Sequence, residues 1–160
     1  MRLIKVGFKK LKEDAILPVK AHPTDSGFDL FANEDVIIEP GGTTVVKTGV
    51  AIKLPPGYEA QVRPRSGITS KTKLRVQLGT IDQDYTGEIG IIVDNIAPHG
   101  RSVGYYGSYD CDTVSGAYKV KKGDRLAQLV IVPMPAVESY IIDELPVTDR
   151  GANGFGSTGY

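Results

Sequence analysis

Short apolar runs rich in Val, Ile, Thr and Tyr recur along the chain, and turns containing Gly or Pro separate them. Such runs are typical of β-strands. No stretch of a dozen residues keeps apolar side chains at helical spacing, and the best helical candidate is a turn or two near 67–73. The pattern predicts an all-β, jelly-roll-like fold. The clearest predicted strands are 35–39, 43–54, 58–64, 88–95, 117–121 and 125–133.

Two segments depart from this strand pattern. Residues 97–116 are polar and rich in Gly and Tyr, and a loop longer than about 12 to 15 residues is uncommon unless it is functional or disordered. Residues 150–160 contain four glycines and have little to bury besides Phe155 and Tyr160. We expect a β-domain over 1–149 with an inserted excursion at 97–116. A flexible C-terminal arm at 150–160 follows, which a ligand or another subunit could order.

Composition limits the classes of function. The length of 160 residues suits one domain, and 19 basic and 19 acidic side chains give a formal net charge of +0. No bulk field therefore favours nucleic acid or a membrane, and any anion site must be local. The one cysteine cannot form an intrachain disulfide, and no apolar run resembles a secretory signal or is long enough to span a bilayer. We expect a cytoplasmic protein.

A local cluster of positive charge lies at residues 61–75, which contain five basic side chains and no acidic one. Ser66 and Gly67 follow Arg65 and add a hydroxyl group and a flexible backbone where a helix is expected to begin. Arginine, hydroxyl and backbone N–H groups together suit phosphate. A solvated charged face is the alternative interpretation. The basic residues are Arg63, Arg65, Lys71, Lys73 and Arg75.

Residues 79–90 have the pattern of a hairpin whose glycines allow a flat ligand to approach the backbone. Asp82 follows the apolar Ile81, and Tyr85 comes three residues later. A carboxylate in a partly apolar corner can accept a proton from water. The alternative for Asp82 is an ordinary Asx-turn. The glycines of this segment are Gly79, Gly87 and Gly90.

The sequence predicts no direct metal ligand set. His22 and His99 lie far apart, and the carboxylates lack EF-hand spacing, so we expect any metal to arrive with a substrate. No G-x-S-x-G motif indicates a serine nucleophile, and Cys111 has no evident activating partner.

Five segments resemble, in order and spacing, the five motifs of the trimeric dUTPases. Together they make up about a third of the chain. The resemblance implies a jelly-roll homotrimer that uses Mg²⁺ to hydrolyse dUTP to dUMP and pyrophosphate, which limits uracil incorporation into DNA and supplies dUMP for dTMP synthesis. The matching segments are DSGFDLFA (25–32), PRSGITSK (64–71), GTIDQDYTGEIG (79–90), GDRLAQLVI (123–131) and RGANGFGSTG (150–159).

The resemblance implies roles on the nucleoside side of the site. Asp82 matches the catalytic aspartate that orients and deprotonates the water attacking the α-phosphorus. Tyr85 matches the tyrosine under deoxyribose that leaves no room for a 2′-hydroxyl. Gly79 and Gly90 fall where family backbones bind uracil, and Ile81 is a further substrate-binding position between them.

The remaining implied residues bind phosphate, close the site or support it. Sites would form at subunit junctions, where the arm of a neighbouring subunit supplies Arg150 to the γ-phosphate and Phe155 to stack on uracil. Gly156 and Ser157 belong to the same binding segment. Asp29 would support the site, through water on Mg²⁺ or through an ion pair at a subunit interface. The implied phosphate-binding residues are Arg65, Ser66, Gly67 and Gln128.

Two alternatives stay open. A dCTP deaminase would carry a catalytic glutamate ten residues after the third-motif aspartate, where this chain has the apolar Ile92. The 97–116 insert resembles in position the insert of some phage-type dUTPases that contact regulatory proteins, and its tyrosines suit an interface. An exposed, family-variable loop is the other interpretation of this insert. Its tyrosines are Tyr105, Tyr106 and Tyr109.

Overall fold

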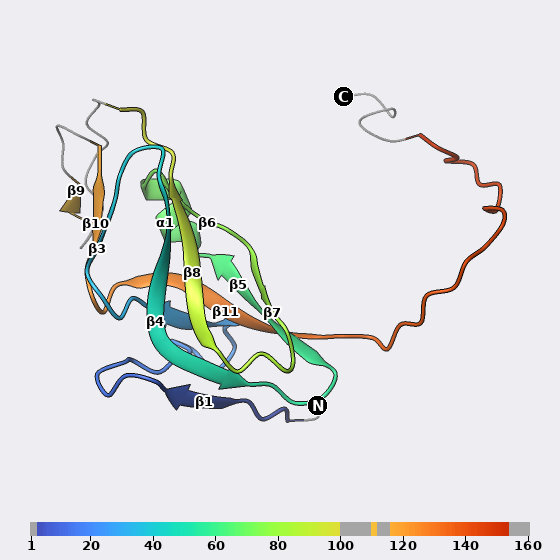
Figure 1. Cartoon of the computed structure of the whole chain (residues 1–160), viewed down its shortest axis with the longest axis horizontal. Coiled ribbons are helices and arrows are strands. Elements are labelled where there is room, and N and C mark those ends of the chain that lie inside the picture. Colours follow the sequence, from blue (N-terminus) through green and yellow to red (C-terminus); the bar gives the residue numbers. More distant parts are fainter. Residues whose placement is uncertain (1–2, 100–109, 112–115, 154–160) are drawn as a thin grey trace.

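The computed structural model describes residues 3–99, 110–111 and 116–153, and its regular secondary structure is β-strand apart from one short helix (Figure 1). The all-β prediction is therefore confirmed. The elements in chain order are β1 (Gly7–Lys10), β2 (Gly27–Phe31), β3 (Val36–Ile38), β4 (Thr43–Lys53), β5 (Tyr58–Pro64), α1 (Ser66–Lys71), β6 (Leu74–Val76), β7 (Gly79–Ile81), β8 (Glu88–Asn95), β9 (Asp110–Cys111), β10 (Tyr118–Val120) and β11 (Arg125–Pro133).

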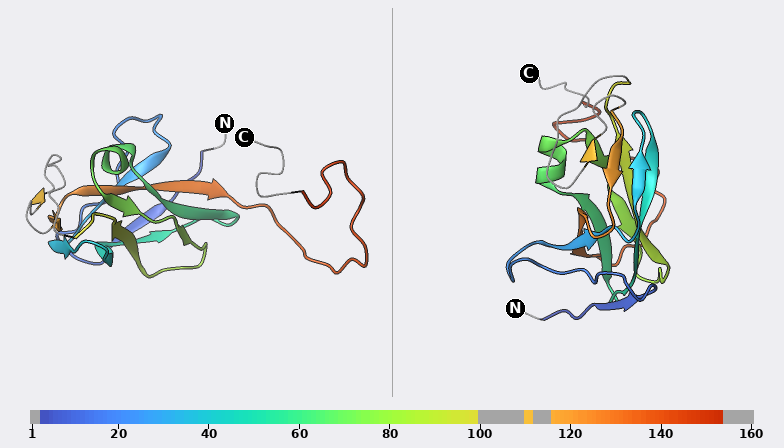
Figure 2. Two further views of the ribbon diagram at one scale, coloured as in Figure 1. Left: turned by 90° about the horizontal axis from the view of Figure 1, so that it is seen from above. Right: turned by 90° about the vertical axis from the view of Figure 1, so that its left-hand side faces the viewer.

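The described strands form two four-stranded sheets and one small sheet. Their orders are β1-β4-β8-β6, β2-β11-β5-β7 and β3-β10-β9, and every described pair is antiparallel. Figure 2 shows the two larger sheets lying against each other. Alternate residues of their strands share one apolar core, as the strand period of two requires. Its fully buried members include Leu30, Val46, Leu74, Ile91, Val93 and Leu129.

The longest strands have the predicted bounds or differ from them by one residue. β5, β8 and β11 have the predicted bounds, and α1 overlaps the predicted helical turn. β1, β2, β6 and β9 were not predicted; each has only two to five residues and includes a charged one. β2 also mixes a glycine and the polar Asp29 with its apolar residues.

The prediction of a hairpin at 79–90 is wrong in its pairing. β7 pairs with β5, whereas β8 pairs with β4 and β6 in the other sheet. Ile81 on β7 and Ile89 on β8 are both buried in the same core. They reach it from opposite sheets, so residues 82–87 form a loop that crosses from one sheet to the other.

The chain leaves the β-domain after β11. Residues 134–153 run away from the sheets, with no described helix or strand (Figure 1). The Met134 N–H donates to the Gly57 carbonyl (2.8 Å) where the segment departs. Large apolar side chains farther along are exposed, including Ile141 at 95% and Leu145 at 82%. The predicted boundary at residue 149 remains a prediction. None of the helices among the described residues has the length and apolarity to cross a bilayer.

Candidate functional site

Three polar residues lie side by side on the outer face of the sheet β2-β11-β5. Asp29 of β2 is opposite Gln128 of β11, and Gln128 is opposite Arg63 of β5. Their sequence neighbours Leu30, Leu129 and Val62 are buried in the core, so the three polar side chains face outward. We call Asp29, Gln128 and Arg63 the polar row.

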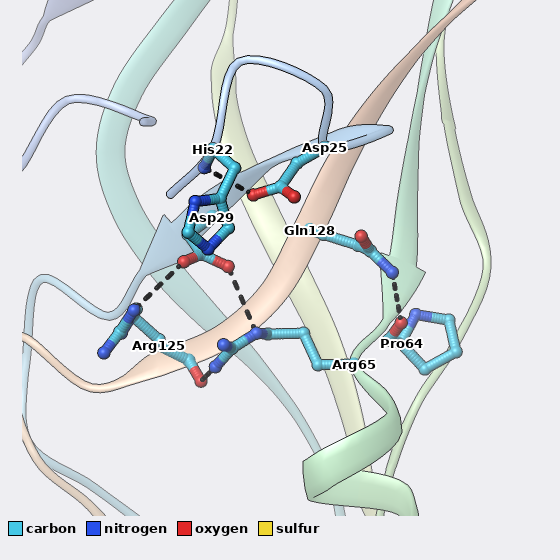
Figure 3. Close-up of polar contacts among 7 residues, drawn as sticks. All are labelled: His22, Asp25, Asp29, Pro64, Arg65, Arg125 and Gln128. Atoms are coloured by element: carbon cyan, nitrogen blue, oxygen red, sulfur yellow. Dashed lines mark hydrogen bonds and ion pairs between the residues drawn. The ribbon is translucent and has the colours of Figure 1, made fainter. Parts of the chain in front are cut away.

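The polar row borders a hollow of about 480 Å³ whose surface is mainly polar. Three motifs that are distant in sequence meet here, from β2, from the β5–α1 junction and from β11. Figure 3 shows how Asp29, Arg65, Arg125 and Gln128 converge beside the loop that carries Asp25. The lining residues are Ala21, Asp25, Ser26, Gly27, Asp29, Arg63, Arg65, Ser66, Arg125, Gln128 and Val130.

Asp29 bridges two arginines of the hollow. Its Oδ1 lies 3.1 Å from Arg65 Nε, and its Oδ2 lies 3.3 Å from Arg125 Nη1. The Asp29 side chain is only 14% exposed, whereas those of Arg65 and Arg125 are 32% and 54% exposed. Arg65 Nη1 also donates to the Arg125 backbone carbonyl (2.9 Å). One carboxylate and one carbonyl therefore fix the direction of the Arg65 guanidinium group.

Gln128 is positioned by its own hydrogen bond and by a glycine. Its Nε2 donates to the Pro64 carbonyl (2.9 Å), directly before Arg65 (Figure 3). A Cβ atom on Gly27 would lie 2.9 Å from Gln128 Oε1 and 3.1 Å from Gln128 Cβ. Only glycine at position 27 leaves the amide this space. Gly27 of the first motif is thus explained by its packing against Gln128, a residue of the hollow.

The donor set of the hollow suits an anion. Three guanidinium groups, of Arg63, Arg65 and Arg125, line the hollow, and the two oxygens of the Asp29 carboxylate already contact Arg65 and Arg125. Among the described residues, no group of three or more His, Cys, Asp or Glu side chains could hold a metal ion. These residues do not fit a Mg²⁺ ion held by the protein alone.

The loop at residues 82–87 has a defined shape. The Tyr85 N–H donates to the Asp82 carbonyl (3.1 Å), and the Tyr85 hydroxyl donates to the Glu88 carbonyl (3.0 Å). A Cβ on Gly87 would overlap the Tyr85 phenol, so this glycine lets the ring lie across the loop. The Asp82 side chain is exposed, and Tyr85 is 47% exposed.

One side chain ties this loop to the rest of the domain. Gln83 Oε1 accepts a hydrogen bond from the Gly57 N–H (2.7 Å) in the turn before β5. Gly57 has a φ of +80°, which glycine adopts without strain. The same Gly57 accepts the hydrogen bond from Met134. The turn therefore contacts both the 82–87 loop and the start of the departing C-terminal segment.

Within one chain, the structure brings together only part of the predicted site. Arg65, Ser66, Gln128 and Asp29 line the hollow, whereas Gly67 lies in α1 outside that lining. The residues expected to bind the nucleoside also lie outside it. These are Gly79, Ile81, Asp82, Tyr85 and Gly90.

The remaining predicted residues have other surroundings. A Cβ on Gly90 would lie 2.7 Å from Val45 Cγ1, so packing between β8 and β4 also favours a glycine there. Arg150 is exposed on the departing segment, where its Nε donates to the Asn153 carbonyl (3.1 Å). Phe155, Gly156 and Ser157 lie outside the described residues.

Sequence reasoning missed several lining residues. Arg63 was recognised only as part of the basic cluster, and Arg125 only as part of a motif. Strand register places both at the hollow, and register is not visible in the order of residues along the chain. Asp25 was likewise part of the first motif, and its carboxylate accepts from the His22 N–H (2.8 Å).

Comparisons with known proteins agree with this geometry. A sequence model of the dUTPase family matches residues 13–100 and 114–159. The deoxyuridine 5′-triphosphate nucleotidohydrolase of Gloeothece citriformis is 44% identical over 158 residues, covering 98% of this chain and 97% of its own. The enzyme of the same name from Clostridioides difficile is 42% identical over 154 residues, covering 95% of this chain and 96% of its own.

Solved structures show the same similarity. The dUTPase of Staphylococcus bacteriophage 80alpha with dUpNHpp superposes with a TM-score of 0.87 at 36% identity, covering 98% of this chain and 99% of its own. The dUTPase from phage phi11 of Staphylococcus aureus has a TM-score of 0.78 at 36% identity, covering 88% and 97% of the two chains.

Proposed function

Because the chain belongs to the dUTPase family, we propose that it hydrolyses dUTP to dUMP and pyrophosphate. The observation that carries the proposal is the hollow where Arg65, Ser66 and Gln128, from two dUTPase motifs, meet. A nucleoside triphosphate carries roughly four negative charges, which must be offset before a nucleophile can approach. Preorganised arginines supply that electrostatic stabilisation without reorganising during the reaction.

Asp82 is the proposed general base. Its carboxylate is exposed, and the backbone hydrogen bond from Tyr85 to Asp82 fixes the loop that carries it. A water molecule gives its proton to Asp82, the oxygen bonds to the α-phosphorus, and the bond from that phosphorus to the bridging oxygen breaks. Pyrophosphate leaves with the bonding electron pair. A positioned base of this kind contributes about 10²- to 10⁴-fold.

Tyr85 is the proposed sugar discriminator. The bond to the Glu88 carbonyl and the space over Gly87 hold its ring in one orientation, with a large part of the side chain exposed. A ring packed against deoxyribose would collide with a 2′-hydroxyl and so disfavour UTP. The backbones of Gly79 and Gly90, with Ile81 between them, are the proposed uracil slot.

We further propose that each active site is shared between copies of the chain in a homotrimer. The hollow and the 82–87 loop both belong to the proposed site, yet the loop does not line the hollow of its own chain. Residues 134–153 leave the domain with exposed apolar side chains, which another copy could cover. The arm would then bring Arg150, Phe155, Gly156 and Ser157 to a neighbouring site.

Mg²⁺ enters this proposal as a partner of the nucleotide. A phage phi11 dUTPase structure is described as coordinating a structural Mg(II) ion. In this chain the hollow favours an anion, so Mg²⁺ would arrive bound to the triphosphate and offset part of its charge. Asp29 would then act mainly by holding Arg65. We also propose a cytoplasmic location, where the nucleotide pool lies.

Pyrophosphate release tests the proposed reaction. The assay compares dUTP, UTP, dTTP and dCTP, with and without Mg²⁺, and we expect turnover of dUTP alone. Hydrolysis in ¹⁸O-water should place the label in dUMP, because attack is at the α-phosphorus. Label in pyrophosphate would contradict the mechanism, and ammonia release from dCTP would support the deaminase alternative.

A regulatory role of the insert is a second candidate. The family model leaves residues 101–113 unmatched, inside the predicted 97–116 insert. The phage 80alpha dUTPase is described as controlling transfer of virulence genes. Deletion of 101–113 tests the candidate. Unchanged dUTP turnover with loss of a co-purifying partner would support it, whereas unchanged partner binding would contradict it.

A further inference from the structure

We propose that Arg63 is an additional phosphate-binding residue of this chain. The inference rests on the proposed function, because it assumes that the hollow receives the phosphates of the nucleotide. Arg63 is not one of the residues that the dUTPase resemblance assigns to phosphate. Three observations on its register, its orientation and its charge support the role.

The first observation is strand register. Arg63 is directly opposite Gln128, which is directly opposite Asp29, so Arg63 occupies the third place of the polar row. Directly opposed residues on one face have their Cβ atoms about 4.5 to 5.5 Å apart. Arg63 also lines the same hollow as Arg65, Ser66 and Gln128. An anion bound there lies within reach of a long arginine side chain.

The second observation is that the guanidinium group of Arg63 is held in place by one neutral acceptor. Nε and Nη2 of Arg63 both donate to Gln61 Oε1, at 2.9 and 2.6 Å. Gln61 Nε2 in turn donates to Glu59 Oε1 at 2.5 Å. Glu59, Gln61 and Arg63 follow one another at every second position of β5, on one face. Of the five N–H groups of an arginine, three remain for a ligand.

The third observation is charge. Arg65 and Arg125 share the Asp29 carboxylate, whereas Arg63 makes no ion pair with any residue in the described part of the chain. Its partner Gln61 supplies an acceptor without a negative charge. A held guanidinium group without a carboxylate partner favours an anionic ligand, and its planar fork suits phosphate oxygens. Arg63 thus adds positive charge that the triphosphate can use.

The test measures binding of inorganic tripolyphosphate by calorimetry and the kinetics of dUTP hydrolysis. The variants are Arg63→Gln, Arg63→Lys and Gln61→Leu, and the charge-matched control is Lys53→Gln on β4 in the other large sheet. A charge-assisted hydrogen bond predicts that Arg63→Gln weakens tripolyphosphate binding about tenfold. KM for dUTP should rise similarly while kcat stays within about threefold, because binding of non-reacting phosphates is uniform.

Arg63→Lys should lose less affinity, since it keeps the charge, and Lys53→Gln should bind like wild type. Gln61→Leu keeps Arg63 but removes the acceptor that holds its guanidinium group. We therefore expect a tripolyphosphate affinity between those of wild type and Arg63→Gln. Tripolyphosphate affinity of Arg63→Gln within twofold of wild type would overturn the inference. If Arg63→Gln does not assemble as wild type does, Gln61→Leu decides instead. An unchanged tripolyphosphate affinity of Gln61→Leu would then overturn the inference. Wild-type turnover of dUTP separately tests the proposed function.

Discussion

Replacement of Asp29 by asparagine distinguishes two roles for this carboxylate. One is to position Arg65, and the other is to contact Mg²⁺ through water. Asparagine keeps the shape of the side chain but removes the charge that faces Arg65 Nε at 3.1 Å and Arg125 Nη1 at 3.3 Å. Its amide group would also point a donor at one of the two guanidinium donors. If Asp29 positions Arg65, both stability and phosphate binding should suffer.

The magnitude follows from exposure. A solvent-exposed ion pair stabilises by about 0.2 to 1 kcal/mol. The Arg65 pair is near the upper end because its side chains are 32% and 14% exposed, and the Arg125 pair is weaker because Arg125 is 54% exposed. Asp29→Asn should therefore lower the free energy of unfolding by about 1 to 2 kcal/mol in urea titrations.

Kinetics distinguish positioning from a metal role. We expect KM for dUTP to rise about tenfold, because Arg65 loses its anchor. A double-mutant cycle of Asp29→Asn with Arg125→Gln measures how much of the rise in KM comes from losing the Asp29–Arg125 ion pair. The loss should be independent of Mg²⁺ concentration. Recovery of wild-type KM at high Mg²⁺ would refute the positioning role and favour a water-mediated metal contact.

Three further predictions concern other parts of the molecule. Gly87→Ala should displace the Tyr85 ring and reduce the ratio of kcat/KM for dUTP to that for UTP. An unchanged ratio would show that the position of the Tyr85 ring does not determine the choice of sugar. Gln83→Ala should lower kcat about tenfold, because it removes the acceptor that ties the 82–87 loop to Gly57. Gln83→Glu keeps that acceptor and should restore kcat, and an equal loss of kcat in the two variants would contradict this. The hydrogen bond from the Lys122 backbone N–H lowers the pKa of the Asp35 carboxyl group, so its stabilisation is present above about pH 4 and is lost as pH falls through the lowered pKa. Asp35→Asn should therefore reduce the fall of the thermal unfolding midpoint below about pH 4, and a fall as steep as in wild type would argue against this bond.

The sequence predicted local features well and cross-strand features poorly. β5, β8 and β11 could be predicted because their own residues alternate or run apolar between clear turns. Arg65 and Ser66 were predicted as site residues because their motif is contiguous. Arg63 was predicted only as a member of the basic cluster and Arg125 only as part of a motif, because only the register of β5 and β11 places them at the hollow.

The pairing of residues 79–90 is a second cross-strand feature that the sequence did not predict. Two strands joined by a six-residue loop have the local pattern of a hairpin. Whether they pair with each other depends on which sheet each strand completes, and β5 and β4 compete for them. Apolar patterning shows that Ile81 and Ile89 are buried, but it does not show that they reach the core from opposite sides.

The proposed active site takes Asp82 and Arg65 from different copies of the chain. Co-refolding Asp82→Asn chains with Arg65→Gln chains tests it most directly, because each variant alone should be inactive. In a shared site, random mixing of equal amounts should restore about a quarter of wild-type dUTP turnover, since about one site in four receives both intact residues. If the mixture stays as inactive as its parents while wild-type chains refolded in parallel are active, Asp82 and Arg65 act within one chain and the claim is wrong.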